Sequence, residues 1–148
     1  MGLWVQGTTK LLKLLPQDVQ DMLKKHEADG TTDSQEYQDA MQVFYNKHVC
    51  SLNPWPELLL KSFSAVEEDD TVYHTMWGSN EFNITGTLRN WSIVDKVQNI
   101  TSPTLLINAP DDEAQDEAMM PFFLGIRRVK WAHFAHSTHL SMYEEHES

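Results

Sequence analysis

Residues 103–118 read PTLLINAPDDEAQDEA, an apolar run that leads directly into a cluster of acidic residues. The run at 105–107 is typical of a strand buried on both faces of a parallel sheet. A helical pattern follows at 114–123, and the segment 127–134, RRVKWAHF, is a second strand candidate. With a last short helix at 140–145, this order predicts an α/β fold that contains a parallel βαβα unit.

The residues before this unit, 1–77, carry helical patterns. Pro16 can open a helix that Gly30 ends, and Thr32 and Gln35 lie at the spacing of a capping box for the next one. Pro56 can open a further helix. Three faces are expected to point inward: Val19, Met22, Leu23 and His26; Tyr37, Met41, Phe44 and His48; and Leu59, Phe63 and Val66.

The pattern changes at 78–91, GSNEFNITGTLRNW, which has turn residues at both ends. Phe82 and Ile84 alternate with polar residues there and predict a short extended segment. Two strands after this point are too few for a complete parallel sheet, because its faces and edges would stay uncovered. The sequence therefore predicts the last part of a larger sheet.

The composition restricts the classes of function. The 148 residues carry a formal charge of −11, which argues against binding to nucleic acids and to anionic membranes. A cationic or amine-bearing ligand fits this charge better. The single cysteine, Cys50, is expected to be an inert buried thiol in a reducing compartment. With neither a signal peptide nor a membrane span in the sequence, we expect a cytoplasmic protein.

Acidic residues and histidines follow the two predicted strands. The acids Asp111, Asp112 and Glu113 come after the first strand, and the loop HSTH at 136–139 comes after the second. Ligands gather beyond the carboxyl ends of parallel strands, and an acid at one end with a histidine at the next is the acid–base half of a hydrolytic triad. By spacing alone, the favoured interpretation is a solvated helix N-terminus, where the acids oppose the helix dipole.

The three-residue spacing of His133, His136 and His139 raises a metal site as another hypothesis. A strand followed by a loop does not bring these positions onto one face, however. We therefore expect neither a metal nor a cofactor.

Four stretches together resemble one family. They are EYQDAMQVFYNKHVCSLNPWP (36–56), DDTVYHTMWGSNEFNITGTLRNWSI (69–93), SPTLLINAPDDEAQDE (102–117) and HSTH (136–139). The family is that of the proline iminopeptidases, α/β-hydrolase-fold serine aminopeptidases that release an N-terminal residue, often proline, from peptides. The similarity runs from about 3 to 145 in the family's order and covers its second half. It implies a helical cap-like region at 1–100 and a C-terminal segment of the hydrolase core at 101–148.

The resemblance also implies roles for single residues. Asp112 matches the triad acid and His139 the triad base. Glu113 and Glu81 match the two acids that hold the free α-amine of the substrate. The resemblance thus implies a peptide or a small amine-bearing molecule as the substrate, bound by charge complementarity.

The chain departs from the family at two places. Ala109 stands where glycine is usual, before Pro110 and Asp111, so the backbone of the acid loop is expected to differ. No serine has a glycine two positions before it, so the G-x-S-x-G nucleophile motif is absent. We therefore expect the chain to be inactive alone, and to bind a complementary N-terminal hydrolase fragment or to self-associate. The alternatives are a non-catalytic binding module with an acidic amine pocket, and a truncated gene product without a selected role.

Overall fold

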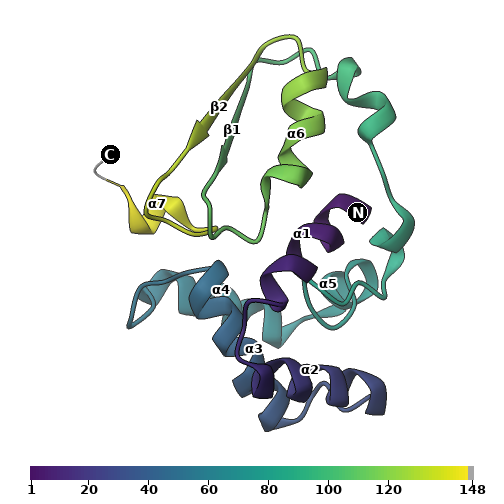
Figure 1. Ribbon diagram of the computed structural model, residues 1–148, viewed down its shortest axis with the longest axis vertical. Coiled ribbons are helices and arrows are strands. Elements are labelled where there is room, and N and C mark those ends of the chain that lie inside the picture. The colour runs from purple at the N-terminus through teal and green to yellow at the C-terminus, as the bar shows by residue number, and fades with distance from the viewer. Residues whose placement is uncertain (147–148) are drawn as a thin grey trace.

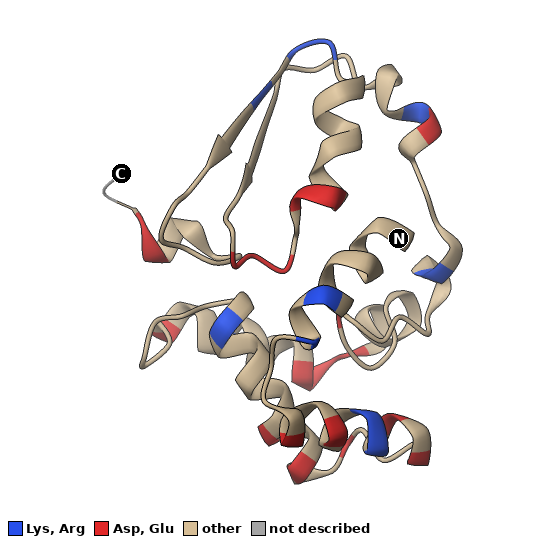
Figure 2. Ribbon diagram, in the orientation of Figure 1, with Lys and Arg blue, Asp and Glu red and all other residues tan. Residues whose placement is uncertain are grey.

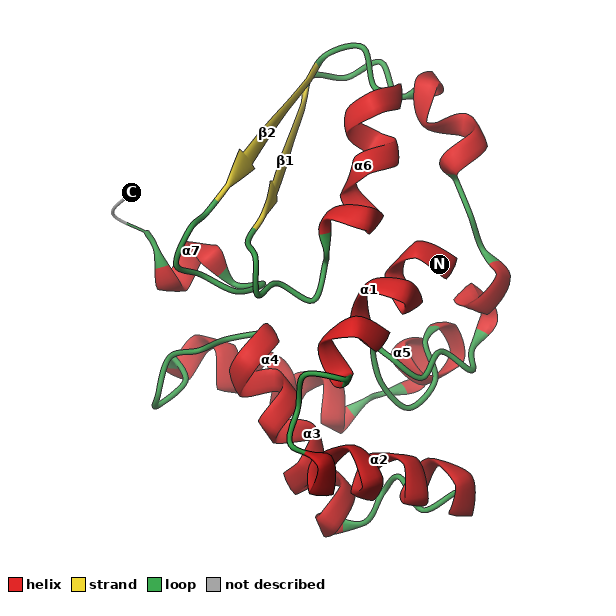
Figure 3. Ribbon diagram, viewed as in Figure 1, coloured by secondary structure: helices red, strands yellow, loops and turns green. Residues whose placement is uncertain are grey.

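The computed structural model describes residues 1–146 and combines a helical part with a strand–helix–strand unit (Figure 1). The helices and strands are α1 (Gly2–Leu12), α2 (Gln17–Asp29), α3 (Gln35–His48), α4 (Glu57–Glu68), α5 (Thr71–Met76), β1 (Thr104–Asn108), α6 (Asp116–Gly125), β2 (Val129–His133) and α7 (Ser141–Glu144). Two 3-10 helices, η1 (Thr87–Asn90) and η2 (Val94–Asn99), connect the two parts. Figure 3 shows that helices make up most of the chain and that both strands lie in the second part.

Helices α2 and α3 pack together, and the predicted inner face of α2 is buried at Leu23 and His26 and partly buried at Val19 and Met22. Gly30 ends α2 with φ of 68°, a left-handed conformation that glycine adopts without steric cost. The predicted inner face of α3 is buried in full, and its Tyr37, Met41 and Phe44 belong to the hydrophobic core. Leu23 of α2 and Phe82 belong to the same core. The predicted capping box is wrong, because Ser34 caps α3 and its Oγ accepts a hydrogen bond from the N–H of Tyr37 at 3.3 Å.

Two other local predictions fail in part. On α4, Leu59 is buried but Val66 is 43 % exposed. The segment 78–91 contains one isolated bridge, between Gly78 and Ile84, and no strand. The side-chain oxygen of Asn80 accepts hydrogen bonds from two backbone N–H groups, those of Phe82 at 3.0 Å and Asn83 at 2.7 Å, and bends the chain there.

The predicted parallel strands are present. Strands β1 and β2 pair in parallel, with Thr104 opposite Val129 and Asn108 opposite His133. Helix α6 connects them and packs against both. Both strands run toward the helical part, so the loops that follow them come close to α3 and α7 (Figure 1). The predicted parallel strand–helix–strand unit is therefore confirmed.

Strand β1 is not buried on both faces, contrary to the first expectation. Leu106 is buried, whereas Leu105 is 58 % and Ile107 43 % exposed. Within residues 1–146 the sheet consists of these two strands alone, so one of its faces has no cover. The incomplete sheet that the strand count predicts is therefore confirmed.

Helix α1 joins the helical part to the strand unit. It packs along α6, where Lys10 forms an ion pair with Glu117. Gly7 makes the close approach possible, because a Cβ there would lie 2.9 Å from the Cβ of Gln115. The assignment of residues 1–100 to a cap and 101–148 to a core segment stays a prediction.

The chemical expectations have different outcomes. Cys50 is fully buried, as predicted, and burial raises the pKa of its thiol. None of the helices formed by residues 1–146 has the length and apolar composition needed to cross a membrane. The cytoplasmic location stays a prediction. Acidic residues mark the loop after β1 and the first turn of α6, at the side of the strand unit that faces the helical part (Figure 2).

Candidate active site

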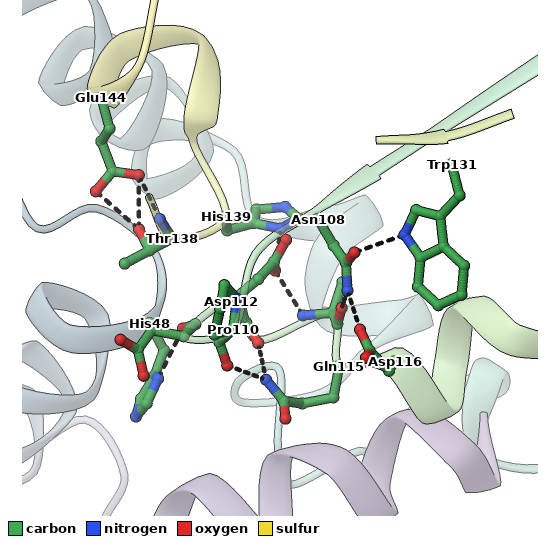
Figure 4. A network of polar contacts seen from close by, with 12 residues as sticks. His48, Asn108, Pro110, Asp112, Gln115, Asp116, Trp131, Thr138, His139 and Glu144 are labelled. Atoms are coloured by element: carbon green, nitrogen blue, oxygen red, sulfur yellow. Dashed lines mark hydrogen bonds and ion pairs between the residues drawn. The ribbon is translucent and has the colours of Figure 1, made fainter. Parts of the chain in front are cut away.

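Asn108 at the end of β1 organises the acid loop. Its buried amide nitrogen donates hydrogen bonds to the carbonyl of Ala114 at 3.0 Å and to Oδ1 of Asp116 at 2.9 Å. Its Oδ1 accepts a hydrogen bond from the indole N–H of Trp131 on β2 at 2.7 Å (Figure 4). A polar residue at the end of an apolar strand was the signal for this role, and the sequence analysis missed it.

Gln115 closes the same loop. Its Nε2 donates hydrogen bonds to the carbonyls of Pro110 at 3.0 Å and Asp112 at 2.6 Å. The Asp112 N–H donates to the carbonyl of Ala109 at 3.2 Å. The loop at 109–115 is therefore held by its own polar groups, despite the unusual Ala109 and Pro110.

The acid and base that the sequence pairs are hydrogen-bonded to each other. His139 Nδ1 lies 2.9 Å from Oδ1 of Asp112, as predicted (Figure 4). The same Oδ1 accepts a hydrogen bond from the N–H of Ala114 at 2.6 Å, and Asp112 is only 2 % exposed. An ionised carboxylate is acceptor-only, so Nδ1 carries the proton and Nε2 is the ring atom left to accept another.

The surroundings of His139 favour its protonated form. Burial lowers the pKa of the imidazole, but the hydrogen bond with Asp112 and the negative charges of Asp112, Glu113 and Glu81 outweigh burial and raise the pKa above its ordinary value. A base whose cation is stabilised in this way is suited to take a proton from a nucleophile and return it later.

Glu113 is a buried carboxyl group with an unused oxygen. It is 5 % exposed, and its Oε2 has no hydrogen-bond partner within residues 1–146. Burial and, next, the negative charge of Glu81 raise the pKa of this carboxyl to about 8, with a smaller contribution from Asp112 and against the opposing effect of His139. A buried polar atom without a partner is costly, which is typical of a group that awaits a ligand.

Glu81 comes from the helical part and is held by two tyrosines. The hydroxyl of Tyr45 on α3 donates to its Oε2 at 2.7 Å, and the hydroxyl of Tyr73 on α5 donates to its Oε1 at 2.6 Å. Burial and, next, the charge of Glu81 raise the pKa of both tyrosines, so they remain hydrogen-bond donors. The sequence analysis did not identify either tyrosine.

The C-terminal end of α3 brings the two loops together. The carbonyl oxygen of His48 accepts hydrogen bonds from the N–H of Glu113 at 3.2 Å and from that of His139 at 3.3 Å. Its imidazole Nδ1 donates to the carbonyl of Asp111 at 2.8 Å, and burial lowers the pKa of this ring, which keeps it neutral. The last carbonyls of a helix have no partner within it, so they are available for such contacts.

The interpretation of these acids as a solvated helix N-terminus does not fit the structure. Helix α6 begins only at Asp116, and Asp112 and Glu113 are buried, so they are not a solvated helix N-terminus. His133 lies 3.5 Å from Asp116 and His139 pairs with Asp112, so these two histidines have different partners. The described residues contain no group of three or more side chains arranged to hold a metal.

Comparisons with known proteins agree with this architecture, although no family model matches the chain. A proline iminopeptidase of Thermoplasma volcanium is 35 % identical over 143 residues, which are 97 % of this chain and 48 % of the relative. The crystal structure of VinJ superposes with a TM-score of 0.94 at 42 % identity and covers 97 % of this chain and 49 % of that one. A proline iminopeptidase structure of Mycobacterium smegmatis gives a TM-score of 0.86 at 36 % identity, over 98 % and 48 %.

The chain thus spans about half the length of the relatives it matches. The match includes the helical part, both strands and the loops that carry Glu81, Asp112, Glu113 and His139, because it covers nearly all of the chain. In sequence and in fold, the chain corresponds to the C-terminal half of a proline iminopeptidase-type α/β-hydrolase.

Proposed function

We propose that this chain supplies the acid, the base and the amine-binding pocket of a serine aminopeptidase that releases N-terminal residues, often proline. The hydrogen bond between Asp112 and His139, beside the bare buried carboxyl of Glu113, is the observation that carries the proposal. In this proposal His139 Nε2 takes the proton of a nucleophile, and Asp112 fixes the ring and stabilises its cation.

Glu113 and Glu81 form the proposed amine pocket. The two carboxyl groups come from opposite parts of the chain and lie close enough for their charges to interact. The tyrosines occupy both oxygens of Glu81, whereas Oε2 of Glu113 has no partner within the described residues. An incoming ammonium group would supply the missing donor to Glu113 and the positive charge that this pair lacks.

The nucleophile has to come from a separate segment, since the sequence has no G-x-S-x-G motif. We propose that this segment is a complementary N-terminal hydrolase half whose strands extend the sheet of β1 and β2. The exposed side chains of Leu105 and Ile107 support this, because parallel sheets are normally covered on both faces.

Hydrolysis of a proline-linked chromogenic substrate tests the proposal. The isolated chain should give a rate no higher than buffer, and addition of the N-terminal half of a related enzyme should produce turnover. The same mixture with His139→Ala should stay inactive. Turnover by the isolated chain that His139→Ala abolishes would reveal an unrecognised nucleophile, and turnover that survives His139→Ala would contradict the acid–base assignment.

A non-catalytic amine-binding module is the second candidate. It is favoured by the combination of an intact amine pocket with the absent nucleophile motif. In this case the chain should bind a free α-amine, and the added N-terminal half should neither bind nor restore turnover. Restored turnover would exclude this candidate as the complete function.

A further inference from the structure

Glu144 on α7 is a hydrogen-bond acceptor for two separate segments of the chain. Its Oε1 accepts from the backbone N–H of Ser51 at 2.7 Å and from the Ser51 hydroxyl at 2.6 Å. Its Oε2 accepts from the N–H of Thr138 at 2.7 Å, and the Thr138 hydroxyl lies 2.9 Å from Oε2 and 3.0 Å from Oε1. One carboxylate therefore connects the segment after α3 with the residue that precedes His139. Figure 4 shows the contact of Glu144 with Thr138.

The end of α3 and the residue after it also bind the C-terminal side of the loop 136–139, which carries His139. The carbonyl of His48 accepts from the N–H of His139 at 3.3 Å, and the carbonyl of Val49 accepts from that of Leu140 at 3.1 Å. Glu144 adds the attachment on the N-terminal side, through Thr138. His139 is thus held from both neighbours against the same helix end, which also binds the N–H of Glu113.

The charge of Glu144 strengthens this attachment. Burial raises the pKa of its carboxyl, but the hydrogen bonds from Ser51 and Thr138 outweigh burial and lower the pKa below its ordinary value. The group is therefore ionised at neutral pH, and hydrogen bonds to an ionised acceptor are about twice as strong as those between neutral groups.

We propose that Glu144 is a positioning residue for His139: by fixing Thr138 to the end of α3, it holds the imidazole against Asp112. The proposal deepens the acid–base role proposed above, but its test needs no turnover. It concerns the geometry of His139 in the isolated chain, so it can be tested even if the chain has no activity.

The experiment is an NMR titration of the His139 ring, with its low-field Nδ1–H signal as a second readout. Four variants are compared with the wild type. Glu144→Ala removes the acceptor, and Thr138→Val removes only the hydroxyl donor and changes no charge. Glu145→Ala is the matched control, because Glu145 is the next residue, has the same charge and accepts from the N–H of His136 at 3.0 Å. Asp112→Asn provides the reference pKa of His139 after complete loss of its ion pair with Asp112.

We expect Glu144→Ala to lower the pKa of His139 toward the value in Asp112→Asn and to remove the Nδ1–H signal by exposing it to exchange. Thr138→Val should shift the pKa in the same direction by a smaller amount, and Glu145→Ala should retain the signal. An unchanged pKa and signal in folded Thr138→Val and Glu144→Ala would overturn the proposal. Equal losses in Glu144→Ala and Glu145→Ala would overturn it too, since they would mean that any loosening of α7 has this effect.

Discussion

Replacing the buried acid Glu113 by glutamine should stabilise the protein, and more strongly at high pH. The pKa of this carboxyl is about 8 in the folded chain, against 4.5 for an accessible glutamate. The folded state therefore holds the proton more tightly than the unfolded state, and the wild type loses stability as the pH rises from 4.5 to 8. A glutamine at this position has no proton to lose, so Glu113→Gln should escape this loss.

The two pKa values give the size of the effect. Between pH 5 and pH 9 the ionisation of Glu113 should cost the wild type about 4 kcal/mol of unfolding free energy that Glu113→Gln retains. Urea unfolding of both proteins at the two pH values measures the difference. The exposed Glu67 provides the control, because Glu67→Gln makes the same chemical change where water screens the charge. A gain that is the same at pH 5 and pH 9 would refute the reasoning.

Three further predictions concern the site and the sheet. Asp112→Asn should lower the pKa of His139, because it removes both a hydrogen bond and a negative charge that favour the imidazolium; NMR titration measures this, and an unchanged or higher pKa would contradict it. Asn108→Ala should destabilise the chain by about 1–3 kcal/mol in urea unfolding, because the indole N–H of Trp131 and the carbonyl of Ala114 lose this partner. An unchanged unfolding free energy would mean that other groups replace the amide. Leu105→Lys should leave the stability of the isolated chain nearly unchanged, because Leu105 is exposed. In sedimentation, the same change should weaken self-association or the binding of an N-terminal half. Undiminished association would place the interface elsewhere.

The sequence predicts those parts of the fold that depend on neighbours along the chain. Helical spacing identifies the buried face of α3, and Gly30 marks the end of α2 correctly. The apolar run before Asn108 and the segment at Val129 give both strands and their parallel order. These patterns are local because helix and strand periodicity repeat within a few residues.

Features that depend on side-chain hydrogen bonds were predicted less well. Asn80 bends a segment whose alternation predicts extension, and Ser34 replaces Thr32 as the cap of α3. Val66 lies on the predicted inner face of α4 and is exposed, because an apolar pattern does not show how far the neighbouring elements reach.

The candidate site likewise has a part that the sequence predicts and a part that only the structure reveals. The resemblance to the family pairs Asp112 with His139, and the structure places the two in contact. The ends of the two predicted strands alone indicate only that acids and histidines lie near one another. The burial of Glu113, the tyrosines that hold Glu81 and the attachment of both loops to the carbonyl of His48 all join residues far apart in sequence. No local pattern contains such contacts, so only the structure reveals them.

Binding of a free α-amine to the isolated chain tests the central claim most directly. Isothermal titration calorimetry with prolinamide should show binding to the wild type, whereas N-acetylprolinamide, which lacks the amine, should not bind. Glu113→Gln should weaken the binding of prolinamide by at least tenfold, because a bound ammonium group stabilises the ionised form of Glu113 whereas glutamine offers only a neutral acceptor, a difference of about 1.4 kcal/mol or more. Equal binding of both amides, or undiminished binding of prolinamide to Glu113→Gln, would contradict the assignment of Glu113 to the amine pocket.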